Sequence, residues 1–103
     1  MKIELCRTTD VEEGAMLQVA LEDRPPLAVY RVEDRFYVTD DTCTHGKASF
    51  SEDGELEGFS VVCTWHDGKF DIRTGAPLCA PCSVPIKTYP VSIKEGAVLI
   101  ELN

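Results

Sequence analysis

The chain has 103 residues, of which 44% are hydrophobic and 27% are charged, as in an ordinary soluble globular protein. This length fits one domain with a modest core, a size at which a bound metal helps stability. The net charge of −8 argues against a nucleic-acid partner. No apolar run reaches 18 residues and the first four residues lack the apolar core of a signal peptide, so we expect a cytoplasmic protein without a membrane partner.

Short segments rich in β-branched or aromatic residues follow one another along the chain and predict an all-β protein. No window shows a 3.6-residue apolar period, so helix is expected to be scarce. Pro25 and Pro26 are expected to break the second strand, and Pro90 indicates a bulge or an edge position, because proline cannot donate to a ladder. A hairpin is expected around residues 33–35 and a turn at residues 95–96. The predicted strands are 2–6, 16–21, 27–32, 36–39, 59–63, 69–72, 86–88, 91–94 and 98–102.

Two Cys-His pairs stand at the centre of the chain, as Cys43-x-His45 and Cys63-x-x-His66. These are the only two histidines, and thiolate and imidazole can share one metal or two metals bridged by sulfide. A structural zinc site usually has two Cys followed by two His, which fits this order poorly. A Rieske cluster needs two matching loops that each lend one Cys and one His, which fits it well. Both metal sites remain open on spacing alone.

The segment Cys43-Thr44-His45-Gly46, with Cys63-Thr64-Trp65-His66-Asp67-Gly68 after it, resembles the Rieske motif C-x-H-x15–17-C-x-x-H. Together with the tail from Arg73-Thr74-Gly75 to Pro90-Val91, the chain is similar to the ferredoxins of bacterial aromatic-ring-hydroxylating dioxygenase systems, of the naphthalene and biphenyl type.

The resemblance implies a single Rieske domain of stacked antiparallel sheets with one 2Fe-2S cluster. A basal part, residues 1–41 and 83–103, would carry an inserted cluster-binding part, residues 42–82. Cys43 and Cys63 would hold the inner iron, and His45 and His66 the outer one. The protein would be a monomer that carries electrons from a flavoprotein ferredoxin reductase to a terminal oxygenase.

An enzymatic role is not expected, because both histidines are used as cluster ligands. A mononuclear iron site of an oxygenase usually needs two further His and a carboxylate, and the chain has no His left for it.

The remaining cysteines do not predict a disulfide framework, since the total of five is odd. Cys6 is expected to be a small buried apolar residue. Cys79 and Cys82 form a C-x-x-C that is expected to be structural, although a thiol redox pair is a further alternative. Respiratory Rieske proteins join their loops by a disulfide at positions that correspond here to Ala48 and Trp65. The loops are therefore expected to be held by packing and by the proline-rich segment 77–85.

Negative charge is concentrated in residues 40–71, which contain eight acidic residues and only two lysines. Such a segment favours docking on a basic surface of another protein.

The residues after His66 predict a low reduction potential. High-potential Rieske proteins have Ser and Tyr where this chain has Gly68 and Phe70, and those hydroxyls donate hydrogen bonds to the cluster. Without such donors to stabilise the reduced form, we expect a potential near the low end of the Rieske range, about −150 mV.

Overall fold

The computed structural model describes residues 2–22, 24–44, 48–63, 68–79 and 84–102. Within these ranges the chain is almost entirely β, with one four-residue α-helix and one 3-10 turn, so the predicted class is confirmed. The elements are β1 (Lys2–Arg7), η1 (Thr8–Asp10), β2 (Met16–Leu21), β3 (Arg24–Val32), β4 (Arg35–Asp40), α1 (Phe50–Asp53), β5 (Gly54–Glu57), β6 (Ser60–Cys63), β7 (Gly68–Asp71), β8 (Pro77–Cys79), β9 (Thr88–Tyr89), β10 (Val91–Lys94) and β11 (Ala97–Glu101).

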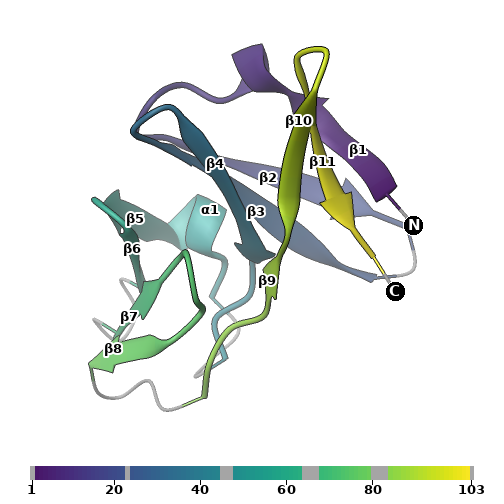
Figure 1. Cartoon of the computed structure of the whole chain (residues 1–103). Helices are drawn as coiled ribbons and strands as arrows, with labels where there is room; N and C mark the ends of the chain where they lie inside the picture. Colours follow the sequence, from purple (N-terminus) through teal and green to yellow (C-terminus); the bar gives the residue numbers. More distant parts are fainter. Residues whose placement is uncertain (1, 23, 45–47, 64–67, 80–83, 103) are drawn as a thin grey trace.

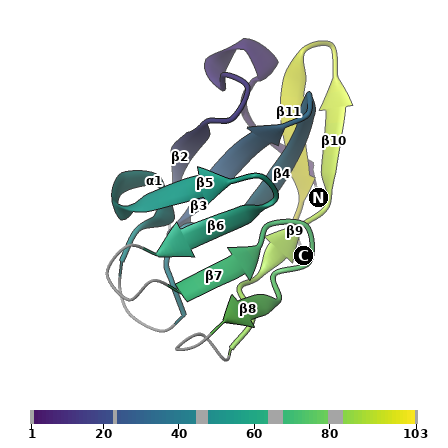
Figure 2. The same cartoon turned by 90° about the vertical axis from the view of Figure 1, so that its left-hand side faces the viewer.

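The described strands form three antiparallel sheets, with strand orders β1-β11-β10, β2-β3-β4-β9 and β5-β6-β7-β8. The first two sheets lie together on one side of the molecule, and the third lies with α1 on the other side (Figure 1). Figure 2 looks onto the third sheet, in which β6 and β7 lie side by side.

Strand β3 is buried on both faces, because its side chains alternate between two cores. Leu27 and Val29 pack in a core with the β1-β11-β10 sheet. Ala28 and Tyr30 pack in a second core with Cys43 and residues of β6 and β7. All four β3 residues are fully buried. The strand thus forms the wall between the two cores.

Two strands begin more than one residue away from the predicted positions, and the other predicted boundaries agree to within one residue. Strand β3 begins at Arg24 rather than after the prolines, and Pro25 and Pro26 stand where its register with β2 shifts, a position in which a missing N–H is tolerated. The strand expected at residues 86–88 begins instead at Thr88, because the Ile86 N–H donates to the Gly75 carbonyl across the chain. Pro90 lies where the chain passes from β9 in one sheet to β10 in another.

Four short elements, η1, α1, β5 and β8, were not predicted. Each has three or four residues, too few for an apolar period to be visible in the sequence.

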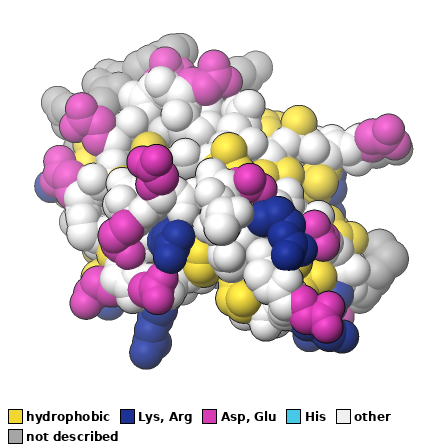
Figure 3. Space-filling model, turned by 90° about the horizontal axis from the view of Figure 1, so that it is seen from above, with side chains coloured by type: hydrophobic (Ala, Val, Ile, Leu, Met, Phe, Trp, Pro, Cys, Tyr) yellow, Lys and Arg dark blue, Asp and Glu magenta, His cyan; other side chains and the backbone are white. Residues whose placement is uncertain are grey.

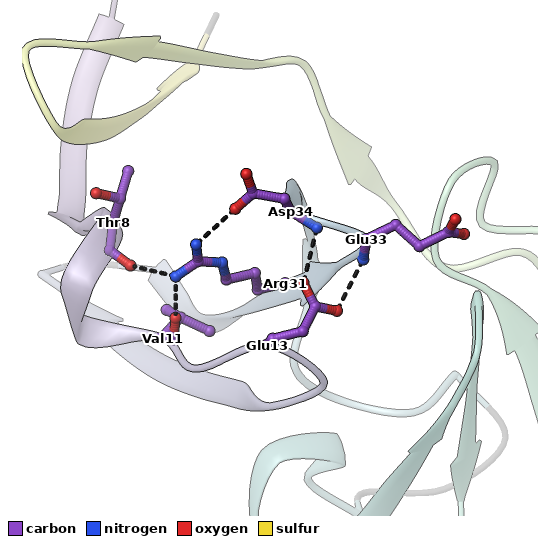
Figure 4. Close-up of polar contacts among 6 residues, drawn as sticks. All are labelled: Thr8, Val11, Glu13, Arg31, Glu33 and Asp34. Atoms are coloured by element: carbon purple, nitrogen blue, oxygen red, sulfur yellow. Dashed lines mark hydrogen bonds and ion pairs between the residues drawn. The ribbon is translucent and has the colours of Figure 1, made fainter.

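The β3–β4 hairpin has both turn residues at positive φ, 53° at Glu33 and 61° at Asp34, as a type I′ turn requires. The Glu13 carboxylate accepts hydrogen bonds from both turn N–H groups, at 2.8 Å and 2.7 Å. Arg31 pairs with Asp34 at 2.5 Å and donates to the Val11 carbonyl at 3.1 Å (Figure 4). These contacts offset the strain of two non-glycine residues at positive φ.

A strap of residues 84–87 connects the third sheet to the rest of the protein. The Ile86 N–H donates to Gly75 at 2.9 Å, and the Lys87 carbonyl accepts from the Asp40 N–H at 3.0 Å. Gly75 has φ +82°, and a Cβ at this position would overlap the Ile86 carbonyl oxygen. The strap therefore depends on a residue without a side chain.

Gly75→Ala should destabilise the protein by the strain of alanine at positive φ plus the overlap with Ile86, together roughly 2–4 kcal/mol. Gly14→Ala is the matched control, because Gly14 has φ +78° with open space around it. Gly14→Ala should cost only the strain of alanine at positive φ, about 1 kcal/mol of unfolding free energy. Denaturant unfolding of the wild type and both variants measures the difference. Equal losses of unfolding free energy in the two variants would contradict the proposed overlap.

Candidate metal centre

The described residues on either side of each Cys-His segment pair with each other, and the two intervening segments have the same length. Cys43 donates its N–H to the Ala48 carbonyl at 2.9 Å, next to an isolated bridge between Thr42 and Ser49. Cys63 pairs with Gly68 at the end of the β6–β7 ladder. Four residues lie between the members of each pair, 44–47 in the first loop and 64–67 in the second. Cys63 is thus the last ladder residue before its loop, and Cys43 directly follows the isolated bridge.

The two cysteines are almost completely buried, with 2% of Cys43 and 1% of Cys63 exposed. They belong to the same core, together with Ala48, Phe50 and Phe70. The rings of Phe50 and Phe70 meet edge to face with their centres 5.6 Å apart. The fold therefore brings two segments twenty residues apart into one water-poor apolar environment.

The other predicted site residues, His45 and His66, lie outside the described residues, as do Trp65 and Cys82. The structure therefore places the two thiols and leaves the full four-residue ligand set a prediction.

Asp41 supports the first loop and was not recognised from the sequence. Its side chain is fully buried. Its carboxylate accepts hydrogen bonds from Gln18 Nε2 at 2.9 Å, Ser49 Oγ at 2.5 Å and the Ser51 N–H at 2.8 Å. Nothing in the sequence indicates these contacts, because Gln18 lies on β2 and is 23 positions away.

The proline-rich segment 77–85 was expected to hold the loops, and Val84 confirms this for the first one. Thr44 Oγ1 donates to the Val84 carbonyl at 2.7 Å, so the residue after Cys43 is tied to the strap. Ile86 fills the same core as the two cysteines and is 3% exposed.

The end of β4, which leads into the first loop, is fixed by two tyrosines. Tyr30 Oη lies 2.8 Å from Thr39 Oγ1, and burial raises the pKa of its phenol. Tyr89 donates to Asp40 Oδ1 at 2.5 Å, and burial together with this hydrogen bond raises the pKa of Tyr89 to about 12. Both phenols are therefore neutral donors at physiological pH.

The third sheet has its own polar anchor at the end of β7. Arg73 donates through Nε and Nη2 to the two carboxylate oxygens of Asp71, at 3.1 Å and 3.0 Å. This hydrogen-bonded guanidinium lowers the pKa of the Asp71 carboxyl. Arg73 also lies over the Phe59 ring, 4.3 Å from its centre. The turn after β7 is thus held to the β5–β6 turn.

Among the remaining cysteines, Cys6 is 8% exposed in the basal core, as expected. Burial is the main cause that raises the pKa of its thiol to about 11. Cys79 is exposed on β8, an edge strand of the third sheet, and the role of the C-x-x-C stays a prediction.

The acidic segment 40–71 is less of a surface feature than its sequence suggests. Asp41 is buried, Asp40 accepts from Tyr89, and Asp71 is paired with Arg73. The exposed carboxylates of α1 and β5 remain, of which Glu57 pairs with the partly exposed Lys69 at 3.3 Å. We call Glu52, Glu55 and Glu57 the acidic edge. Elsewhere, acidic side chains are mixed with basic and apolar ones, as on the face seen from above (Figure 3).

The family model described as the Rieske [2Fe-2S] domain matches residues 1–90. The chain belongs to the Rieske [2Fe-2S] family. The chemistry of the described donors fits this cofactor, since two buried thiols on matching loops are the soft ligands that iron–sulfur clusters use. The predicted 2Fe-2S cofactor is thereby confirmed over the zinc alternative at the level of the family.

Relatives of this Rieske protein are named as ferredoxins. The ferredoxin component of the p-cumate 2,3-dioxygenase system of Pseudomonas putida is 46% identical over 98% of this chain and 86% of that protein. The ferredoxin component of the naphthalene 1,2-dioxygenase system of Pseudomonas putida is 48% identical over 98% of this chain and 95% of that protein. These names agree with an electron-transfer component rather than an enzyme.

Solved structures give the same result for the fold. The Sphingomonas yanoikuyae B1 ferredoxin superposes with a TM-score of 0.94 at 45% identity, and each chain is fully covered. A ferredoxin in a complex of reduced oxygenase and oxidized ferredoxin of carbazole 1,9a-dioxygenase has a TM-score of 0.91 at 44% identity, over 96% of this chain and 91% of that one. The predicted Rieske fold is confirmed. None of the helices in the described ranges is long and apolar enough to cross a membrane.

Thr44→Val should loosen the first loop, because it removes the hydroxyl that donates to Val84. We expect a cost of about 1 kcal/mol in unfolding free energy and faster loss of the cluster to a chelator, followed by visible absorbance. Ser60→Ala is the control, since Ser60 also donates to a backbone carbonyl, that of Glu57, but in the β5–β6 turn. Equal rates of cluster loss in the two variants would show that the strap does not retain the cluster.

Proposed function

We propose that this Rieske ferredoxin carries single electrons from a flavoprotein ferredoxin reductase to the terminal oxygenase of an aromatic-ring-hydroxylating dioxygenase system. The observation that carries the proposal is the nearly full-length similarity to ferredoxin components of such systems. The similar ferredoxin solved in complex with the carbazole 1,9a-dioxygenase oxygenase supports the oxygenase as a partner.

Cys43, His45, Cys63 and His66 are the proposed ligands of one cluster per chain. The burial of both thiols supports Cys43 and Cys63 as ligands of the inner iron, and His45 and His66 are proposed for the outer iron. Residues 42–82 would form the cluster-binding part and residues 1–41 and 83–103 the basal part. A monomer located in the cytoplasm is part of the same proposal.

The cluster supplies a site that accepts and gives one electron. The chain's own residues fix Cys63 at the end of a ladder and Cys43 by a hydrogen bond to Ala48, and Phe50 and Phe70 exclude water from both thiols. Such a rigid and dry environment needs little rearrangement when the charge of the site changes, which suits a carrier.

His45→Ala or His66→Ala should abolish the Rieske spectrum, because each removes a ligand of the outer iron. The protein should also unfold at lower temperature, since metal binding contributes to folding in a small metallodomain. Iron and zinc analysis, the rhombic spectrum of the reduced form and thermal unfolding give the readouts.

Cys6→Ala is the control, because Cys6 lies in the basal core and should keep the cluster. A colourless wild-type protein that contains zinc would establish the alternative, a zinc-stabilised interaction module. Full iron occupancy in either histidine variant would refute the ligand assignment.

Electron transfer should slow as salt rises if the acidic edge docks on basic partners, because ions screen exposed charges. The rate can be measured with the reductase and oxygenase components of the naphthalene 1,2-dioxygenase system. Replacing Glu52, Glu55 and Glu57 by Gln should flatten the salt dependence. The same change at the exposed Glu4, Glu12 and Glu22, which lie outside α1 and the third sheet, is the charge-matched control. Docking through apolar contacts would instead leave the wild-type rate independent of salt.

Phe70→Tyr should raise the reduction potential, because Phe70 is fully buried in the core of both cysteines. One new hydrogen bond to the reduced site contributes about 1 kcal/mol, which for one electron is roughly 40 mV. Phe59→Tyr, at the opposite end of β6, is the matched control without an expected shift. A wild-type midpoint well above zero would show that other donors already act on the cluster.

A further inference from the structure

We propose that Asp41 is a positioning residue for the cluster, which fixes the first ligand loop and lowers the reduction potential through a buried negative charge. The inference rests on the proposed function in one respect, namely that Cys43 is a cluster ligand.

Asp41 holds the base of the first loop through its backbone as well as its side chain. Its N–H donates to the Pro26 carbonyl at 3.1 Å, and its carbonyl accepts from the Phe50 N–H at 2.8 Å. Its carboxylate accepts from Ser49 and Ser51, which follow the loop. One residue thus connects the strand that enters the loop, the segment that leaves it and the start of β3.

The hydrogen bonds satisfy the carboxylate oxygens without neutralising the charge. All three donors, the Gln18 amide, the Ser49 hydroxyl and the Ser51 N–H, are uncharged. The ion pairs found among the described residues involve other acidic groups, namely Asp34, Glu57 and Asp71. A buried carboxylate is costly unless it is well bonded, and three donors provide that bonding.

The charge lies close enough to act on the cluster. Asp41 is two residues from Cys43, so their Cα atoms are at most about 7 Å apart. Both side chains are buried, and charges interact more strongly in the low-dielectric interior than in water. An electron added to the cluster is repelled by this carboxylate, so the oxidised form is favoured.

The charge and the shape of Asp41 can be separated by mutation. In Asp41→Asn the amide oxygen can accept from the Ser51 N–H, while the amide NH2 faces Gln18 and Ser49. The Ser49 hydroxyl can accept as well as donate, so it can accept from the new amide, while Gln18 keeps its hydrogen bond to Glu52 at 3.2 Å. Gln18→Leu does the opposite, because it removes a donor and leaves the carboxylate in place.

The experiment is a voltammetric titration of the cluster-loaded proteins. The iron content of each protein is measured beside it. We expect Asp41→Asn to favour the reduced cluster about tenfold at a fixed potential, which for one electron is a rise of about 59 mV. Gln18→Leu should shift the midpoint the other way, since the charge loses a compensating dipole. Loosening of the loop alone would move both variants in the same direction.

Glu55→Gln is the charge-matched control. Glu55 is exposed on β5 and pairs with Val62, next to Cys63, so the same charge is removed in water, where it is screened. An Asp41→Asn midpoint equal to that of wild type or Glu55→Gln would overturn the inference. If Asp41→Asn does not retain iron, a Gln18→Leu midpoint at or above the wild-type value overturns it, and a lower one supports it. A wild-type protein without a Rieske spectrum would refute the proposed function instead.

Discussion

Strand β3 is buried on both faces, and the arrangement of the whole protein depends on this strand. Leu27 and Val29 fill the core beneath the β1-β11-β10 sheet, while Ala28 and Tyr30 fill the core that contains both cysteines. Because successive side chains point to opposite faces, a shift of one residue would exchange the two sets. The pairing of β3 with β2 and β4 therefore fixes the position of the proposed metal centre relative to the β1-β11-β10 sheet.

The proposed metal centre lies at two hairpin ends, and the residues that hold these ends are remote in sequence. The strap of residues 84–87 contacts the first loop at Thr44, the turn after β7 at Gly75 and the end of β4 at Asp40. Asp41 joins the same loop to β2 through Gln18. In the absence of the disulfide that respiratory Rieske proteins use, backbone hydrogen bonds and one buried carboxylate hold the loop.

A carrier of the proposed kind must keep its cluster and also exchange electrons with the proposed reductase and oxygenase. The apolar core around Cys43 and Cys63 serves retention, because it excludes water from the thiols. The acidic edge on α1 and β5 lies on the same side of the molecule as this core (Figure 1). Retention of the cluster and docking of the proposed partners can thus be altered by different residues of the same region.

The sequence alone determined the family, the cofactor and most strands. The Cys-His spacing is specific because few sites need those four donors in that order, and strands such as β1, β2 and β10 are visible because their apolar pattern is local. Only the tertiary structure decided that Asp41 is buried rather than part of a docking surface, that β3 extends across Pro25 and Pro26, and that Ile86 leaves a strand to fill the core. Each of these features depends on partners far away along the chain, Gln18 for Asp41 and Gly75 for Ile86. Local patterns carry no information about such contacts, because the same residue is stable in water or in a core according to what folds against it.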